Sequence, residues 1–210
     1  YGSVTGRLTT KSNSFPILNL KKEIADIVKP TNDVFIQFDF NGAEVRTLLS
    51  LSGESQPQED IHEFNAKILK CTREKAKKKF FAWFYNPNKK NVELSEVYKR
   101  DKVLEQYYSD GIVRTPFGRK IEADDFHSFN YLLQSSSSDN CLQQAIKINK
   151  FLHGRKSFVQ SVVHDSITID FHKHDRDLIN QIKQIFEDTR LGQFKSSMHI
   201  GKNYRDMEVV

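Results

Sequence analysis

Val34-Phe35-Ile36-Gln37-Phe38-Asp39-Phe40 is a run of β-branched and aromatic residues that follows a turn-like segment, residues 30–33. This composition predicts a buried strand. Its one charged residue, Asp39, falls near the end of the run, and helical periodicity begins soon afterwards, at about residue 43. The segment therefore predicts a strand that holds a carboxylate at or near its end, beside the start of a helix.

A second β-rich segment, residues 158–171, also carries an acid. It is interrupted at His164-Asp165-Ser166, so two apolar strands flank a polar tripeptide and predict a tight β-hairpin with Asp165 at its tip. A carboxylate in such a position is costly unless it is solvated, paired or bound to a metal. Two acids from separate strands can share divalent cations, and their hard oxygen atoms suit Mg²⁺. Each Asp taken alone is more simply explained as part of a turn.

Helical periodicity recurs through the rest of the chain. Helices are expected at residues 43–52, 61–69, 72–85, 94–108, 126–152 and 175–189, and a hairpin is expected around Pro116-Phe117-Gly118. Pro87 is expected to stop the third of these helices, because proline cannot continue a helix. In the longest helix, Ser135-Ser136-Ser137-Ser138 predicts a patch of small residues that another segment approaches closely. Helices mixed with a few non-adjacent strands indicate an α+β domain.

Composition and charge exclude several classes of protein. The chain is 38% hydrophobic and 28% charged, which excludes a disordered chain and a membrane-embedded one. Its cysteines, Cys71 and Cys141, have no metal-ligand spacing, which argues against a zinc ribbon and fits a reducing compartment. The net charge is +5, and residues 71–120 carry 13 Lys and Arg against 6 Asp and Glu, a local +7. This asymmetry fits a polyanionic partner, although a solvated, lysine-rich helix face explains it more simply.

The helix expected at residues 72–85 has one unusual face. Arg73, Lys77, Phe81 and Tyr85 recur every four residues, and at about 100° per residue they fan over about 120° of the helix surface. Two cations, a flat ring and a phenol on one face can grip a triphosphate, stack on a sugar and reach a base. For this helix alone, a basic amphipathic helix without a ligand is the simpler interpretation.

Considered together, these residues resemble the family A DNA polymerases, the polymerase I type. Residues 39–46 (Asp-Phe-Asn-Gly-Ala-Glu-Val-Arg) resemble motif A, the series from Arg73 to Tyr85 resembles motif B, and Val163-His164-Asp165 resembles motif C. Weaker signatures occur in the family's order: Thr5-Gly6-Arg7-Leu8, Asp60-Ile61-His62, Thr115-Pro116-Phe117-Gly118-Arg119, and Asn130 with Gln134 and Asp139. The seven signatures span nearly the whole chain.

The resemblance implies a template-directed DNA polymerase that adds dNTPs to a primer 3′-hydroxyl by a two-metal mechanism. Asp39 and Asp165 would be the catalytic residues and would hold two Mg²⁺ ions, with Mn²⁺ as an alternative. The dNTP-binding residues would be Arg73, Lys77, Phe81, Tyr85, His62 and Glu44. Among these, Glu44 would be the steric gate that excludes a ribose 2′-hydroxyl. The DNA-binding residues would be Arg7, Asn130, Gln134 and His164.

The resemblance also implies a domain plan. An antiparallel palm sheet would carry the two catalytic Asp residues, with palm segments at residues 1–70 and 116–210 and a reduced helical fingers subdomain at residues 71–115. The thumb and the 3′–5′ exonuclease are not expected within this sequence. Besides primer-template DNA and dNTPs, the expected partner is therefore a separate chain that supplies these parts, or a processivity factor.

The resemblance also bears on where the protein is expected to occur. No membrane association is expected. The compact, divergent form favours a phage-encoded protein in the host bacterial cytoplasm, and a first residue other than Met favours a fragment or one subunit of a split enzyme.

Three departures from the family pattern keep two alternatives open. Ser166 stands where motif C usually has Glu, Asn41-Gly42 replaces Ser-Gln in motif A, and Asn86 replaces the Gly that ends motif B. Ser166 and the expected lack of a thumb are consistent with a polymerase-derived DNA-binding subunit without catalysis. His-Asp-Ser also occurs in single-subunit RNA polymerases, so RNA synthesis is a second alternative, although Glu44 and Phe81 favour deoxynucleotides.

Overall fold

The computed structural model describes residues 2–86 and 88–210. Tyr1 and Pro87, the latter expected to stop a helix, lie outside the described residues. The chain divides into two compact units: unit 1 is Tyr1–Phe40, Ser138–Arg190 and Ser196–Val210, and unit 2 is Asn41–Ser137 and Leu191–Lys195. The expected palm and fingers boundaries are functional assignments and stay a prediction.

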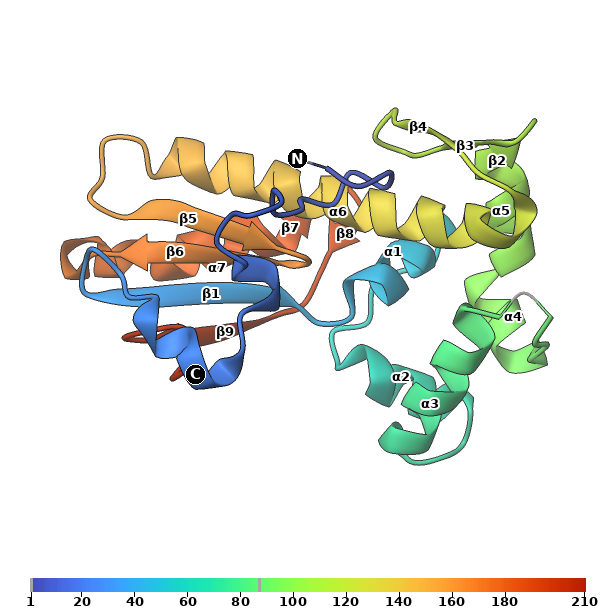
Figure 1. Ribbon diagram of the computed structural model, residues 1–210. Helices are drawn as coiled ribbons and strands as arrows, with labels where there is room; N and C mark the ends of the chain where they lie inside the picture. Colours follow the sequence, from blue (N-terminus) through green and yellow to red (C-terminus); the bar gives the residue numbers. More distant parts are fainter. Residues whose placement is uncertain (1, 87) are drawn as a thin grey trace. The chain divides into compact units, whose positions relative to one another are not determined.

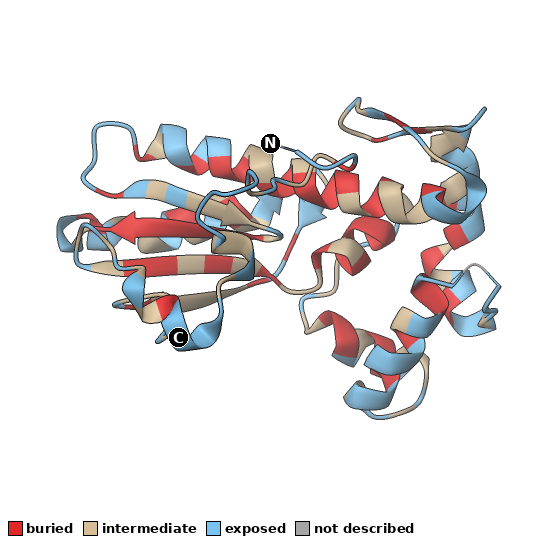
Figure 2. Cartoon of the chain, in the orientation of Figure 1, coloured by how far each residue is buried: buried red, intermediate tan, exposed pale blue. Residues whose placement is uncertain are grey.

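Unit 1 is built on an antiparallel sheet whose strands, in the described part of the chain, run in the order β10-β9-β1-β6-β5 (Figure 1). The strands are β1 (Val34–Phe40), β5 (Phe158–Val163), β6 (Ser166–Phe171), β9 (Ser196–Gly201) and β10 (Glu208–Val209). β1 lies at the centre, and β6 beside it is buried along its whole length (Figure 2). The predicted strand, the predicted hairpin and the α+β fold class are confirmed.

A helix packs on this sheet through an aromatic side chain. On α7 (Ile179–Glu187), the ring of Phe186 stacks on that of Phe40, with centroids 4.0 Å apart and planes 9° apart. The other short elements of the unit are η1 (Ile17–Asn19), η2 (Lys22–Ile27), η3 (Lys173–Leu178) and β7 (Asp188–Thr189). The helix expected at residues 175–189 is therefore wrong in its first turns, which form the 3-10 helix η3. There Asp175 accepts hydrogen bonds from the backbone N–H and the hydroxyl of Ser157, at 2.9 and 2.7 Å.

The long helix α6 (Asp125–Phe151) begins in unit 2 and continues into unit 1. All four serines at residues 135–138 are buried. The hydroxyl of Ser138 donates to the carbonyl oxygen of Gly6 at 3.4 Å. The predicted close approach of another segment to this serine patch is therefore confirmed.

Unit 2 is mainly helical. Besides the first part of α6, its elements are α1 (Ala43–Leu51), α2 (Ile61–Ile68), α3 (Arg73–Phe84), α4 (Val92–Tyr98), α5 (Arg100–Tyr107), β2 (Tyr108–Ser109), β3 (Ile112–Arg114), β4 (Lys120–Glu122) and β8 (Gly192–Gln193). Strands β2, β3 and β4 form an antiparallel sheet. Phe80, Trp83 and Phe84 on α3 pack with buried apolar side chains from the other helices into one core. Among the described residues, no helix has the length and apolar character that crossing a membrane requires.

The helix expected at residues 94–108 is two helices, so that prediction is wrong. Lys99 between them has a φ of 45°, in the left-handed region that no helical residue adopts. Its ammonium group pairs with Glu54 at 2.5 Å. The next residue, Arg100, donates to the carbonyl oxygen of Trp83 at 2.6 Å, and its guanidinium lies 4.9 Å from the centroid of that indole. These tertiary contacts hold the break between α4 and α5 in place. The sequence did not reveal the break, because the apolar residues before and after it have the spacing of a single helix.

Gly42, just before α1, meets two steric requirements. Its φ is +66°, and a Cβ atom at this position would lie 2.6 Å from Cγ2 of Ile61. Gly53 has a similar φ of +80°, but a Cβ atom there would have no neighbour within 4 Å among the described atoms. Substituting each glycine in turn therefore distinguishes the cost of backbone strain, which both positions share, from the cost of a steric clash, which only Gly42 has.

We expect Gly42→Ala to lower the free energy of unfolding by about 3 kcal/mol, because left-handed strain and overpacking against Ile61 add together. Gly53→Ala, the matched control, should cost about 1 kcal/mol through strain alone. Urea unfolding of both variants measures the difference. Equal losses would show that the approach of Ile61 does not matter.

Candidate functional site

Strands β1 and β6 are neighbours in the unit 1 sheet (Figure 1). Asp39 lies on β1, and Asp165 lies in the turn that leads into β6. Asp39 on β1 is paired in register with Ser166, the first residue of β6. The backbone N–H of Phe40 donates to the carbonyl oxygen of Asp165 at 3.2 Å. His164 and Asp165 form the turn between β5 and β6, and His164 is exposed, with a left-handed φ of 52°. The fold thus brings together two carboxylates that are 126 positions apart in the sequence.

The electrostatics of this pair favour a cation. Burial raises the pKa of Asp39 to about 6, and the neighbouring charge of Asp165 adds to the effect. The same two charges act on the thiol of Cys141 on α6. Its pKa is raised well above the usual value, mainly by burial and further by the charges of Asp165 and Asp39. Cys141 is therefore an unreactive thiol. A cation between the two acids would relieve their repulsion.

The donor set fits a hard divalent metal ion. Within the part of the chain that the structure describes, no group of three or more His, Cys, Asp or Glu could hold a metal. Two carboxylates can still be enough for Mg²⁺, which keeps several waters and takes other ligands from substrate phosphates. Ser166, which stands where the resemblance would place a Glu, is buried, and its hydroxyl donates to the carbonyl oxygen of Val163 at 2.9 Å. It shapes the hairpin and adds no charge to the site.

In unit 2, several predicted nucleotide-binding residues form a connected row. The ring of His62 meets that of Phe81 edge-on at 5.5 Å, and Phe81 stacks on Tyr85 at 5.7 Å with planes 8° apart. The hydroxyl of Tyr85 then donates to Oε2 of Glu44 on α1 at 3.0 Å. The structure therefore brings together four of the six residues predicted to bind a dNTP.

Arg73 and Lys77 continue this row at the N-terminal end of α3. Burial lowers the pKa of His62, and the positive charges of Lys77 and Arg73 lower it further against the opposing effect of Asp60. The imidazole is therefore neutral at pH 7, and a phosphate contact from His62 would be an N–H hydrogen bond without charge. Lys77 is exposed, whereas Arg73 is partly buried.

Sequence reasoning gave no role to Asp60, which contacts Arg73 directly. Nε and Nη2 of Arg73 donate to the two oxygens of Asp60, each at 3.0 Å. Although burial alone would raise the pKa of Asp60, hydrogen bonds from Arg73 and Asn41 hold it well below the usual range. Asp60 also accepts the backbone N–H groups of His62 and Glu63, so it is the N-cap of α2. The sequence carried a signal for this cap, since Asp60 and Glu63 have capping-box spacing.

Arg46, the last residue of the motif A segment, was also missed. It is completely buried, and its guanidinium donates to the backbone carbonyl oxygens of Asn41, Pro57 and Glu59 at 2.8, 3.0 and 2.9 Å. It holds the loop that leads to Asp60. No local pattern predicts that a charged side chain takes these backbone partners.

The four predicted DNA-binding residues divide between the units. Arg7 and His164 line one small hollow of unit 1. Asn130 and Gln134 are one turn apart on α6 in unit 2, and Nε2 of Gln134 donates to Oδ1 of Asn130 at 2.9 Å. Each pair is thus placed together within its unit.

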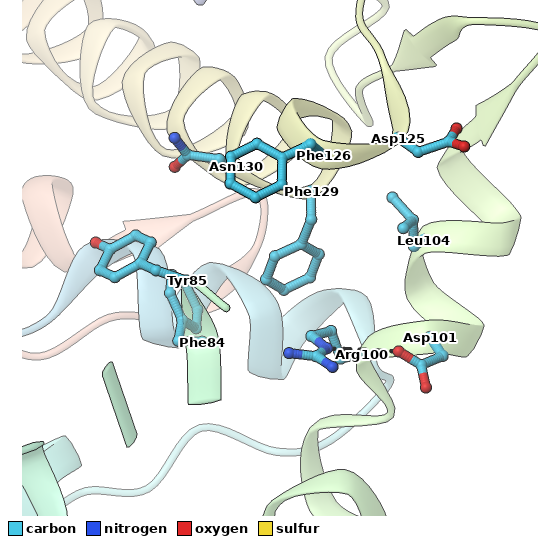
Figure 3. Close-up of a pocket in the computed structure, with 9 residues that line it drawn as sticks. All are labelled: Phe84, Tyr85, Arg100, Asp101, Leu104, Asp125, Phe126, Phe129 and Asn130. Atoms are coloured by element: carbon cyan, nitrogen blue, oxygen red, sulfur yellow. Dashed lines mark hydrogen bonds and ion pairs between the residues drawn. The ribbon is translucent and has the colours of Figure 1, made fainter. Parts of the chain in front are cut away.

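A pocket of unit 2 opens beside Tyr85 (Figure 3). Its lining comes from the end of α3 with its C-cap residue, from α5 and from α6, and comprises Phe84, Tyr85, Arg100, Asp101, Leu104, Asp125, Phe126, Phe129 and Asn130. Phe126 is 68% exposed and Tyr85 is 51% exposed. The pocket offers aromatic surface, one amide and the charged side chains of Arg100, Asp101 and Asp125 next to the predicted nucleotide-binding row.

Comparisons with known proteins bear on the fold. No protein-family model matches the sequence, and no curated protein sequence is significantly similar to it. Among solved structures, the chain is similar to the POL domain of Pol1 from M. smegmatis, in complex with DNA primer-template and dNTP, with a TM-score of 0.75 and 16% sequence identity. The match covers 98% of this chain and 47% of that chain, so this chain spans about half the length of the solved one. The likeness shows a polymerase-domain fold.

Proposed function

We propose that this chain is the palm and fingers part of a template-directed DNA polymerase of the family A type. The observation that carries the proposal is the pair of Asp39, on β1, and Asp165, in the turn that leads into the neighbouring strand β6, in a fold similar to a polymerase domain solved with primer-template and dNTP. Both acids come from segments that resemble motifs A and C of that family.

Asp39 and Asp165 would hold the divalent cations, two Mg²⁺ or alternatively Mn²⁺. When bound, such ions activate an attacking hydroxyl and stabilise a leaving phosphate oxygen. Asp39 must first lose its proton, which its raised pKa makes costly below about pH 6. The protein's own share of the work is positioning and charge neutralisation, because phosphoryl transfer leaves it little covalent chemistry.

The residues of unit 2 would bind the incoming nucleotide. Arg73 and Lys77, with His62, would hold the triphosphate, and Phe81 would stack near the sugar. Glu44 would exclude a ribose 2′-hydroxyl, and its hydrogen bond with Tyr85 would fix the position of that gate. Tyr85 itself would guard the insertion site.

The duplex would be contacted by the remaining four residues. Arg7 and Gln134 would contact minor-groove acceptors that all correct base pairs share, Asn130 would assist Gln134, and His164 would lie near the primer terminus. Residues 1–70 and 116–210 would form the palm, and residues 71–115 the fingers. The protein partner would be a separate chain that supplies a thumb and an exonuclease, or a processivity factor.

A primer-extension assay tests the proposal. We expect Mg²⁺-dependent addition of the dNTP that complements the template, with low processivity unless a thumb is supplied, and a preference for dNTPs over rNTPs in competition. Salt-sensitive DNA binding without incorporation, with or without a thumb-bearing partner, would select the non-catalytic alternative. A preference for rNTPs would select RNA synthesis instead.

A further inference from the structure

The carboxylate of Asp60 is the centre of a polar network within unit 2. It receives the paired N–H groups of Arg73, the side-chain amide of Asn41 at 2.9 Å, and the backbone N–H groups of His62 and Glu63 at 2.9 and 3.0 Å. Its side chain is 24% exposed and that of Arg73 is 37% exposed. A carboxylate with this many donors has one fixed orientation, which it imposes on the guanidinium.

The geometry of the pair leaves Arg73 able to bind an anion. A guanidinium has five N–H donors in one plane, and Asp60 occupies one on Nε and one on Nη2. Nη1 approaches Oε1 of Glu74 at 3.4 Å, but that side chain is 77% exposed and the contact is long. Asp60 thus fixes the plane of the guanidinium from one edge and leaves donors on its other edges.

Asn41 in turn fixes Asp60. Its Nδ2 donates to Asp60, and its Oδ1 accepts the backbone N–H of Ile61 at 3.1 Å. Its own backbone N–H donates to the carbonyl oxygen of Lys195 at 2.8 Å, and its carbonyl oxygen accepts from Arg46. Every polar group of Asn41 is therefore engaged. The network therefore runs, within unit 2, from Asn41 to Arg73 on α3.

We propose that Asp60, held in place by Asn41, is a positioning residue that orients Arg73 for the triphosphate of the incoming nucleotide. The inference deepens the proposed function and rests on it. It also gives Asn41 a structural role, because its side-chain amide donates to Asp60 and accepts from the backbone N–H of Ile61.

The test is Asp60→Asn. Asn is as good an N-cap as Asp, so α2 should keep its first turn while Arg73 loses the charged partner. We expect the KM for dNTP to rise about 10-fold and kcat to change less than about 3-fold, because a binding interaction is weakened before the chemical step. In the Arg73→Ala background, Asp60→Asn should add no further rise in KM, since the two residues act as one unit.

Glu59→Gln is the matched control. It neutralises the adjacent acid, whose carboxylate pairs with Lys67 at the surface, and it should leave the KM for dNTP unchanged. An unchanged KM in Asp60→Asn would overturn the inference. So would a double variant in which Asp60→Asn raises the KM of Arg73→Ala by the same factor as it raises the KM of the wild type. The dissociation constant of dNTP with Ca²⁺, measured by equilibrium dialysis, should shift by the same factor as KM. A wild-type chain that binds dNTP but does not extend a primer would contradict the proposed function, and the dialysis would still decide the role of Asp60.

Discussion

Asp39→Asn should abolish primer extension, with a loss of at least about 10³-fold, and should at the same time stabilise the metal-free chain. Asn has the shape of Asp but no negative charge, so it cannot hold a cation against water. Asp165→Asn should abolish extension for the same reason. Extension assays in Mg²⁺ and in Mn²⁺, at saturating dNTP, measure the loss.

The gain in stability follows from the raised pKa of Asp39. Its folded pKa of about 6 lies above the ordinary value of 3.8. The folded chain therefore binds this proton more tightly than the unfolded chain does. The corresponding stability is fully present below about pH 4 and is lost as the pH rises through about 6. Above pH 6, the ionised, partly buried carboxylate costs about 3 kcal/mol, which Asn avoids.

Urea unfolding in a chelator, across pH 4 to 8, tests this sign. The stability advantage of Asp39→Asn over wild type should grow through this range and level off above about pH 6. Mg²⁺ should remove most of the advantage, because it binds the ionised wild-type site. Asp188→Asn, an exposed acid on β7, should change neither extension nor stability. If Asp39→Asn extended primers normally, the metal-binding role would be refuted, and if it were less stable at every pH, Asp39 would be a structural acid.

The contrast between β1 and β9 shows how far sequence reasoning reaches. The apolar run of β1 and the polar break in the β5–β6 hairpin are local patterns, and both predicted their elements correctly. Strand β9 pairs with β1 along most of its length, yet its sequence, Ser-Ser-Met-His-Ile-Gly, carries little β signal. Its place is set by pairing with a distant strand, and such tertiary selection overrides local propensity.

The candidate site also contains some residues that a local sequence pattern singled out and others that it did not. Residue type, spacing and the family resemblance singled out the two acids and the α3 residues from the sequence, and the roles of these residues stay a prediction. Asn41, Asp60 and Arg46 act through backbone groups of other segments, and a one-dimensional pattern does not show where those groups lie. Only the Asp60 cap had a local signal.

Arg46→Met should strongly destabilise unit 2. The guanidinium is completely buried and donates to the carbonyl oxygens of Asn41, Pro57 and Glu59. Met fills much of the same volume but donates nothing, so three backbone acceptors lose charge-assisted hydrogen bonds. We expect the free energy of unfolding to fall by about 4–5 kcal/mol. That is a large part of the total stability of an ordinary domain.

The same change should weaken nucleotide binding. The loop that Arg46 holds leads directly to Asp60, and Asn41 loses one of its four anchors, so Arg73 should lose its fixed orientation. In whatever fraction of Arg46→Met stays folded, the KM for dNTP should therefore rise about 10-fold, as in Asp60→Asn. Arg46→Lys should recover only part of the stability, because one ammonium group cannot reach three carbonyl oxygens that lie in different directions.

Arg114→Met is the control, because it makes the same replacement of arginine by methionine at an exposed position. Arg114 is exposed on β3, and its guanidinium donates to the hydroxyl of Ser109 at 2.9 Å, so its replacement should change stability by less than about 0.5 kcal/mol. Urea unfolding of the three variants, followed by nucleotide titration of those still folded, gives the comparison. Were Arg46→Met to unfold at the same urea concentration as Arg114→Met, the loop before Asp60 would be held by other contacts. The orientation of Arg73 would then depend on Asp60 and Asn41 without Arg46.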